Sequence, residues 1–160
     1  TDEIQRLAGD AIEVTGYVPD TTPYLKSSAI SIAPLRFGAG MKGKIGEAMS
    51  HGLPVVTTTV GVDGFGLTPG ENVLVADSAE DCAGAVVRLM RDPSLAHKVG
   101  ANGRKFIDDN YAEAAVAKKL YIYLDNLKAK QVKKLPTHVF LTIRSADFLQ
   151  RHLLWRFQRP

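Results

Sequence analysis

The chain has 160 residues, of which 45% are hydrophobic and 23% are charged, as in an ordinary globular protein. This length predicts one domain with a real hydrophobic core. The single cysteine, Cys82, excludes an internal disulfide, and no apolar run is long enough for a membrane span or typical of a signal peptide. We therefore expect a cytoplasmic protein in a reducing compartment.

Charge is unevenly distributed along the chain. The net charge is +3, yet residues 128–160 carry eight Lys and Arg against one acid, which gives this segment +7 and leaves residues 1–127 at −4. We therefore divide the chain into a compact part, residues 1–127, and a basic amphipathic tail, residues 128–160. Because the compact part is acidic, the overall charge of +3 does not indicate a nucleic-acid partner.

Strands and helices are predicted to alternate along the compact part. The opening TDEIQRLAGD is typical of the middle of a helix, so we expect the natural chain to be longer at its N-terminus. Runs of β-branched or continuously apolar residues predict four strands, at residues 11–18, 29–34, 53–59 and 72–77. Capping signals and apolar spacing predict helices, within residues 19–28, and at 44–52, 78–92, 93–110 and 111–127.

This alternation predicts an α/β fold with a doubly wound, Rossmann-like parallel sheet and right-handed crossovers. Ligands of such sheets bind beyond the carboxyl ends of the strands. Glycine-rich loops at residues 35–43 and 60–71 follow two of the predicted strands. We therefore expect the ligand to bind beside these loops.

The first of these loops has the composition of an anion site. Gly38, Gly40 and Gly43 let the backbone come close to a ligand. A helix that begins near Lys42 or Gly43 directs unpaired N–H groups and a positive dipole end outward, and Lys44 adds a second lysine charge. These residues indicate a phosphate or diphosphate, and a plain surface turn is the alternative.

Glu47 lies three residues after Lys44, on about the same helix face. Two interpretations stay open: a surface ion pair with Lys44, or a carboxylate that accepts hydrogen bonds from sugar hydroxyls, as acidic groups do with ribose in dinucleotide-binding folds. A dinucleotide-dependent oxidoreductase is disfavoured, because no G-x-G-x-x-G follows a strand with an acid about twenty residues on.

Other polar residues near this edge have structural interpretations beside the functional ones. His51 ends a helix, where the dipole favours a cation. Thr57 to Thr59 suit a strand, and Cys82 is expected to be a small core residue. Arg36 either reaches a phosphate or stays in solvent, and Asp63 either caps its loop or belongs to the site.

The segment PLRFGAGMKGKIGEAMSHGLPVVTTTVGVDGFG resembles the nucleotide-sugar-binding half of retaining GT-B glycosyltransferases of family 4, the glycosyl transferases group 1. The shared pattern is a strand ending in proline, a glycine loop, K-I-x-E-A-M-x-x-G-x-P-V-V and a second glycine loop. The matching residues are Pro34, Arg36, Gly38, Gly40, Lys44, Ile45, Glu47, Ala48, Met49, Gly52, Pro54, Val55 and Val56. The resemblance covers residues 11–127 and implies a partial C-terminal domain of the GT-B fold.

The resemblance implies transfer of a sugar from a nucleotide-diphosphate sugar to an acceptor, with retention at the anomeric carbon and with neither a metal nor another cofactor. It implies no certain catalytic residue. Glu47 would hold the ribose hydroxyls, the loop backbone would hold the diphosphate, and Lys44 would add charge or only orient Glu47. The implied nucleotide-sugar-binding residues are Glu47, Lys44, Gly40, Met41, Lys42, Gly43 and Arg36.

Two departures from the family pattern matter. Many relatives carry a glutamate eight positions before Glu47 that contacts the donor sugar, and this chain has Ala39 there. A branch of the family with PLR-G-G loops also lacks this glutamate. The acceptor domain and the first strands of the donor domain are absent, so we expect the chain alone to bind nucleotide weakly and to be inactive. The alternative is a non-catalytic nucleotide-sugar-binding module that another chain completes.

The tail, residues 128–160, mixes apolar and basic side chains. It would either lie on the anionic inner face of the membrane, as suits a lipid-linked acceptor in cell-surface polysaccharide biosynthesis, or pack against the absent N-terminal domain. Its apolar face is also compatible with a homodimer. The acceptor, whether saccharide, lipid-linked or protein, and the donor base and sugar are not given by the sequence, and no nucleic-acid partner is expected.

Overall fold

The structure is a computed structural model that describes residues 2–129. The chain divides after Ala115 into two units, and the sheet belongs to the first. The elements are, in chain order, α1 (Asp2–Gln5), α2 (Thr22–Ser27), β1 (Ser31–Ala33), α3 (Gly43–Ser50), β2 (Val55–Thr57), α4 (Thr59–Val62), β3 (Leu74–Val75), α5 (Ala79–Arg91), α6 (Pro93–Tyr111) and α7 (Glu113–Ala129).

Three short parallel strands form the sheet, in the order β1-β2-β3. Val56 in the central strand β2 is fully buried and pairs with Ile32 of β1 and Leu74 of β3. All three residues of β2 are buried, as expected for a parallel strand covered on both faces. The strands predicted within residues 29–34, 53–59 and 72–77 are therefore confirmed, each in a shorter form.

The predicted strand at residues 11–18 is wrong. This segment makes only an isolated bridge, between Gly9 and Ile12, and Ile12 and Tyr17 are 52% and 92% exposed. A β-branched segment becomes a strand only when a neighbour supplies backbone partners and an apolar surface, and no described segment does so here. The helix expected from the opening residues is limited to the short α1.

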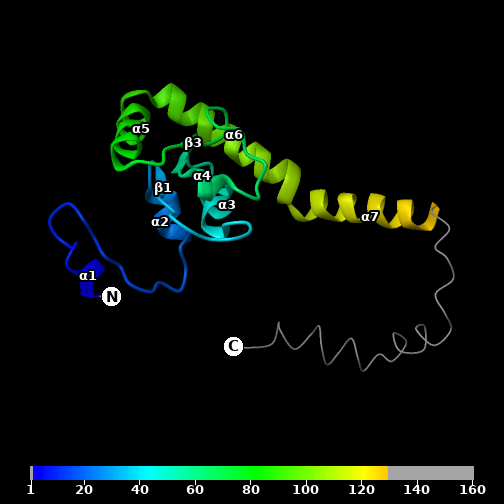
Figure 1. Cartoon of the computed structure of the whole chain (residues 1–160), viewed down its shortest axis with the longest axis horizontal. Helices are drawn as coiled ribbons and strands as arrows, with labels where there is room; N and C mark the ends of the chain where they lie inside the picture. Colours follow the sequence, from blue (N-terminus) through cyan, green and yellow to red (C-terminus); the bar gives the residue numbers. More distant parts are fainter. Residues whose placement is uncertain (1, 130–160) are drawn as a thin grey trace. The chain divides into compact units, whose positions relative to one another are not determined.

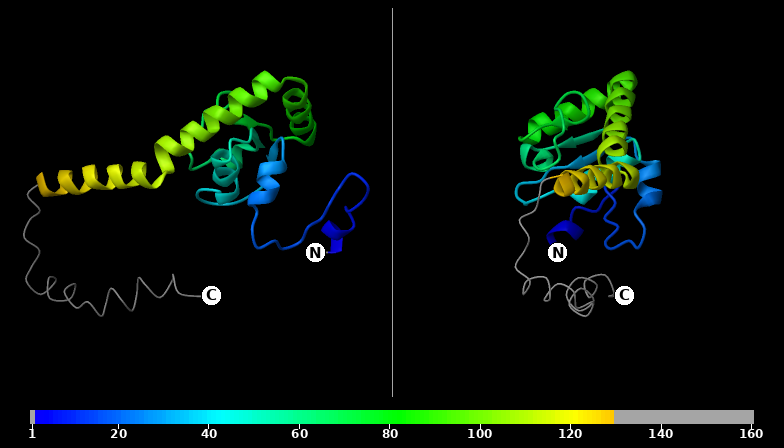
Figure 2. Two further views of the ribbon diagram at one scale, coloured as in Figure 1. Left: turned by 180° about the vertical axis from the view of Figure 1, so that it is seen from behind. Right: turned by 90° about the vertical axis from the view of Figure 1, so that its right-hand side faces the viewer.

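Helices cover both faces of the sheet. On one face, Ile45, Ala48 and Met49 of α3 pack in a core with the sheet and with Phe65. On the other face, α5 contributes Leu89 to a second core that contains Val56. Figure 1 shows α5 and α3 on different sides of the three strands, and the views in Figure 2 agree. The doubly wound α/β arrangement predicted from the sequence is thus confirmed.

The helix ends follow local capping chemistry. Lys42 is the N-cap residue of α3, His51 is its C-cap, and Gly52 follows with a φ of 77° that suits glycine. The Ser78 hydroxyl accepts a hydrogen bond from the N–H of Asp81 and donates to its carboxylate, so Ser78 caps the start of α5. The predicted loop at residues 60–71 differs from expectation because it overlaps the short helix α4.

Glycines let α6 lie directly against the core. A Cβ on Gly100 would stand 2.2 Å from the carbonyl oxygen of Gly52, and one on Gly103 would stand 3.1 Å from Cε of Met49 and 3.2 Å from the carbonyl oxygen of Asn72. Only a residue without a side chain allows backbones to approach so closely. The helix thereby holds the junction of α3 and β2 and the segment that leads into β3.

The second unit begins at Val116 and includes most of α7. Val116, Leu120, Tyr123 and Leu127, which were predicted to share a helix face, are exposed to solvent. The predictions for the tail concern residues 130–160 almost entirely, and these lie outside the described residues. Within residues 2–129, no helix has both the length and the apolar character needed to cross a membrane.

Candidate functional site

The carboxyl ends of the three strands meet at one edge of the sheet, which we call the carboxyl edge. The loop of residues 34–42 follows β1, Thr58 follows β2, and Asp77 follows β3. The N-terminus of α3 comes directly after the first of these loops. The sequence-predicted loop therefore lies at the edge where ligands of parallel α/β sheets bind.

Threonine hydroxyls join the loops of the carboxyl edge. The Thr58 hydroxyl donates to the carbonyl oxygen of Leu35 at 2.6 Å. Both the N–H and the hydroxyl of Thr59 donate to the Asp77 carboxylate, at 2.7 and 2.6 Å. These two hydrogen bonds favour the charged carboxylate and lower the pKa of Asp77 below its ordinary value of 3.8. The threonines thus do more than favour strand structure, since they fix the edge.

The glycine loop rests on the loop after α4. Lys42 is only 8% exposed, and its ammonium donates to the carbonyl oxygen of Asp63 at 3.3 Å. Gly40 and Gly64 both have positive φ, and a Cβ on Gly64 would lie 3.5 Å from the carbonyl carbon of Gly40. The buried Lys42 therefore joins the glycine loop to the loop after α4, while Asp63 itself is exposed to solvent.

The start of α3 is open to solvent. Met41, Gly43 and Lys44 are exposed, and the N-cap residue Lys42 makes no side-chain hydrogen bond to the first turn. The first N–H groups of a helix have no acceptor within the helix. Together with the charge of Lys44, these donors make the N-terminus of α3 suitable for an anion.

Glu47 lies on α3 beside the turn that precedes α2. It makes no ion pair with Lys44 in the described structure, and its Oε1 accepts a hydrogen bond from the hydroxyl of Thr21 instead. The adjacent Asp20 accepts a hydrogen bond from the N–H of Thr22, and this bond lowers the pKa of the Asp20 carboxyl group. The charge of His51 lowers that pKa to a smaller extent. The ion-pair interpretation of Glu47 is therefore wrong, and one turn holds its carboxylate in place.

Arg36 lies apart from Glu47. It lines a pocket of about 530 Å³ on the α5 side of the sheet, whose wall is mainly apolar and includes Ile32 and Val86. Asp77 and Ser78 supply polar groups of the same pocket. The structure therefore brings Met41 to Glu47 together around α3 but places Arg36 on the opposite face.

Two residues of this edge were not among the sequence predictions for the site. Thr21 belongs to the turn PDTTPY, where the only signal was that hydroxyl and proline residues precede a short helix. Asp77 lies two residues after the end of β3, and an acid at the carboxyl end of a predicted parallel strand is a usable signal. Cys82 is half-buried in α5 as a free thiol and packs against the second core. Among residues 2–129, no group of three His, Cys, Asp or Glu side chains is placed to hold a metal ion.

Comparisons with known proteins agree with the fold. The chain is 29% identical, over 94 residues, to a Klebsiella pneumoniae protein named "Uncharacterized 44.6 kDa protein in cps region"; the match covers 59% of this chain and 24% of that protein. The C-terminal domain of a glycosyl transferase group 1 family protein (LpcC) from Francisella tularensis superimposes with a TM-score of 0.55 at 21% identity, over 60% of this chain and 51% of that one.

A sucrose-phosphate synthase (tll1590) from Thermosynechococcus elongatus superimposes with a TM-score of 0.53 at 26% identity, over 68% of this chain and 28% of that one. The chain thus spans about a quarter of the Klebsiella protein and about half of the Francisella domain. The family model described as "Glycosyl transferases group 1" matches residues 1–92, which is more than half of the chain. The chain therefore belongs to the glycosyl transferases group 1 family.

Proposed function

We propose that this chain is the donor-binding part of a retaining glycosyltransferase that uses a nucleotide-diphosphate sugar. The observation that carries this proposal is the arrangement around α3, where an exposed carboxylate, Glu47, lies one helical turn from open N–H donors and Lys44. The membership of the chain in the glycosyl transferases group 1 supports the same proposal.

The diphosphate would bind at the N-terminus of α3. Negative charge develops on the leaving nucleoside diphosphate when the bond to the sugar breaks, and fixed N–H donors stabilise such charge without reorganising. The buried Lys42 keeps the loop in one position, because its ammonium is bound to the carbonyl of Asp63. Lys44, which is exposed and unpaired in the described structure, supplies the charge that faces solvent.

Glu47 would hold the ribose. Its Oε1 is occupied by the hydroxyl of Thr21, while Oε2 has no partner among the described residues. A carboxylate fixed through one oxygen offers the other to a ribose hydroxyl, and a charge-assisted hydrogen bond of this kind is stronger than a neutral one. Thr21 then acts as a positioning residue for Glu47.

The rest of the reaction involves groups outside the described structure. We propose a cytoplasmic enzyme of cell-surface polysaccharide biosynthesis, in keeping with the Klebsiella relative named for a cps region. Its acceptor would be a saccharide, a lipid-linked sugar or a protein, and the basic tail would provide peripheral contact with the membrane. The site needs no metal in this proposal, because N–H groups and Lys44 neutralise the diphosphate.

The second candidate function is a nucleotide-sugar-binding module that another chain completes. It is favoured by the position of β1, which is an edge strand of the described sheet. The exposed edge of β1, where Ile32 is 50% exposed, would then receive additional structure from that chain. Both functions predict no transfer by this chain alone. Transfer by a single longer polypeptide that contains this chain would favour the first function, whereas a requirement for a second polypeptide would favour the module.

Calorimetric titration of the chain with UDP, GDP and ADP tests donor binding. Binding of one nucleotide should weaken in Glu47→Ala by about 10- to 150-fold, the equivalent of about 1.5–3 kcal/mol for a hydrogen bond to a charged group. Thr21→Val should weaken it less, because Glu47 keeps its charge but loses its orientation. Glu80→Ala removes another exposed acid, from α5, and serves as the matched control. Equal affinities in Glu47→Ala and Glu80→Ala would overturn the assignment of Glu47.

A further inference from the structure

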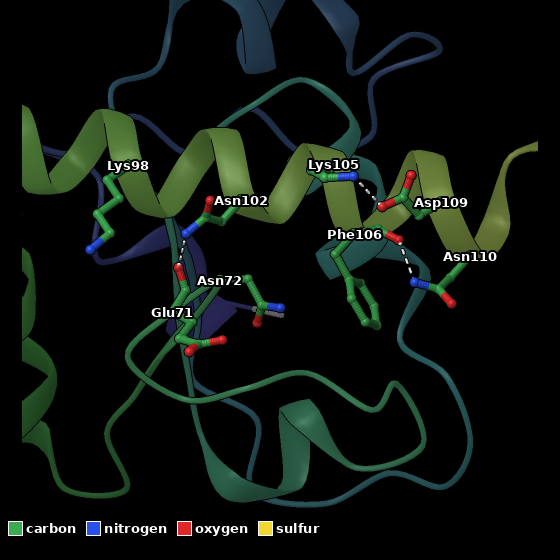
Figure 3. A pocket seen from close by; sticks show the side chains of 8 residues that line it. All are labelled: Glu71, Asn72, Lys98, Asn102, Lys105, Phe106, Asp109 and Asn110. Atoms are coloured by element: carbon green, nitrogen blue, oxygen red, sulfur yellow. Dashed lines mark hydrogen bonds and ion pairs between the residues drawn. The ribbon is translucent and has the colours of Figure 1, made fainter.

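A second pocket lies at the opposite edge of the sheet, between α6 and the residues that precede β3. It has a volume of about 380 Å³. Lys98, Asn102 and Phe106 follow one another at intervals of four residues and therefore share one face of α6. Figure 3 shows the side chain of Asn102 directed toward Glu71, with Lys98 and Phe106 on either side of it along α6. We call this the amino-edge pocket, and the proposed donor site uses none of its residues.

Asn72 is the most buried polar residue of this pocket, with 8% of its surface exposed. Its Oδ1 accepts a hydrogen bond from the N–H of Thr68 at 2.9 Å, which fixes the orientation of the amide. Its Nδ2 has no partner in the part of the chain that the structure describes, where every fully buried side-chain nitrogen and oxygen has one. The Nδ2 group is therefore a fixed donor that opens into the pocket.

Asn102 presents the complementary acceptor. Its Nδ2 donates to the carbonyl oxygen of Glu71 at 2.9 Å, as the dashed line in Figure 3 marks, so its Oδ1 is left to a ligand. The half-buried ring of Phe106 lies next along α6 and gives the pocket one apolar surface. Gly103 holds α6 close to the carbonyl of Asn72, which keeps donor, acceptor and ring in a fixed relation.

The charges around the pocket cancel. Lys105 and Asp109 pair at 2.6 Å, and this carboxylate raises the pKa of Lys105. Lys98 and Glu71 bring one further positive and one further negative charge. A net charge of zero gives no electrostatic preference for an anion or a cation, whereas amides that offer one donor and one acceptor match the vicinal hydroxyls of a sugar.

We propose that the amino-edge pocket binds a neutral saccharide unit. Asn72 would donate to one hydroxyl, Asn102 would accept from its neighbour, and Phe106 would cover the apolar C–H face of the pyranose ring. This second site goes beyond donor binding, because it holds a sugar without a nucleotide. In a protein that handles glycans, it would retain a sugar chain at a distance from the carboxyl edge.

Nuclear magnetic resonance of the full chain tests the proposal, because each asparagine side chain gives its own pair of N–H signals. The probes are methyl glycosides of glucose, galactose and mannose, and inorganic phosphate in a separate titration. We expect one glycoside to shift the Asn72 and Asn102 signals saturably at millimolar concentration. Asn102→Ala should weaken this binding about three- to tenfold, the loss expected for one neutral hydrogen bond. Asn126→Ala, an exposed asparagine of α7, is the matched control.

Three outcomes would overturn the proposal. They are the absence of shifts with all glycosides, unchanged affinity in Asn102→Ala, and a stronger response to phosphate than to the sugars. Asn72→Asp provides an independent variant, because it keeps the acceptor for Thr68 and replaces the Nδ2 donor by a charged acceptor. Glu47→Ala should leave the glycoside response unchanged, so failure of the donor site and failure of the amino-edge pocket are distinguishable.

Discussion

Substitution of Gly100 by alanine should destabilise the fold, although alanine is the better helix former. The new Cβ would stand 2.2 Å from the carbonyl oxygen of Gly52, 3.2 Å from its carbonyl carbon and 3.3 Å from the nitrogen of Pro54. All three atoms belong to the backbone at the junction of α3 and β2, so no side-chain rotation relieves the clash. Either α6 or this junction has to move.

The magnitude follows from two opposing effects. Replacing glycine by alanine inside a helix contributes about 0.8–1 kcal/mol of stability. Forcing an extra methyl group into a packed core costs about 1–3 kcal/mol, and contact with rigid backbone places this site at the upper end. The net loss should be about 2 kcal/mol. Gly84 in α5 provides the control, because a Cβ there meets nothing within 4 Å, so Gly84→Ala should gain close to the full propensity term.

Urea denaturation followed by circular dichroism at the helix band measures both effects. The expected order of unfolding free energy is Gly84→Ala above the parent chain, and the parent chain above Gly100→Ala. If Gly100→Ala were as stable as the parent, α6 would not be held against the α3–β2 junction as the structure has it. A loss in both variants would instead refute the propensity argument for exposed helix positions.

Three further predictions concern the carboxyl edge. Thr57→Val removes a buried hydroxyl that donates to a β1 carbonyl at 2.6 Å, so chemical denaturation should show a loss of about 1–2 kcal/mol. The hydrogen bonds from Thr59 lower the pKa of Asp77, so they stabilise the fold fully at pH values above 3.8, and this stabilisation is lost as the pH falls through the folded-state pKa. In Asp77→Asn the melting temperature should therefore fall less steeply at acid pH than in the parent chain. Lys42→Met should cost about 1 kcal/mol of stability, because it removes the hydrogen bond from the Lys42 ammonium to the carbonyl oxygen of Asp63. Lys44 is exposed, so Lys44→Met should leave the unfolding midpoint unchanged and weaken nucleotide binding in calorimetry.

Elements with local determinants are predictable from the sequence. The apolar spacing of α3 and the glycine at position 52 determine both the helix and its end, and Ser78 with Asp81 determines the start of α5. The alternation of strands and helices was enough for the doubly wound class. The segment 11–18 failed because a strand depends on partners that are distant in the sequence.

The details of the candidate site depended on distant contacts in the same way. The contact of Thr21 with Glu47 joins residues 26 positions apart, and nothing in the spacing of Glu47 and Lys44 excluded the ion pair that the structure lacks. Lys42 and Lys44 look equivalent in the sequence. In the structure, Lys42 is buried and bonded to the carbonyl oxygen of Asp63, whereas Lys44 is exposed. Burial of this kind is decided by the loop that packs opposite, which a local pattern does not specify.

The long helix α6 packs against α3 and against the residues that lead into β2 and β3. At Gly100 its backbone fixes the junction from which α3 presents Glu47, and at Gly103 it fixes Asn72, the buried donor of the amino-edge pocket. The same helix carries Asn102 on the face that lines that pocket. Side-chain changes at Glu47 or Asn102 therefore act at one edge each, while a backbone displacement at Gly100 reaches both. Binding measured in these three variants separates the chemistry of each site from the packing that they share.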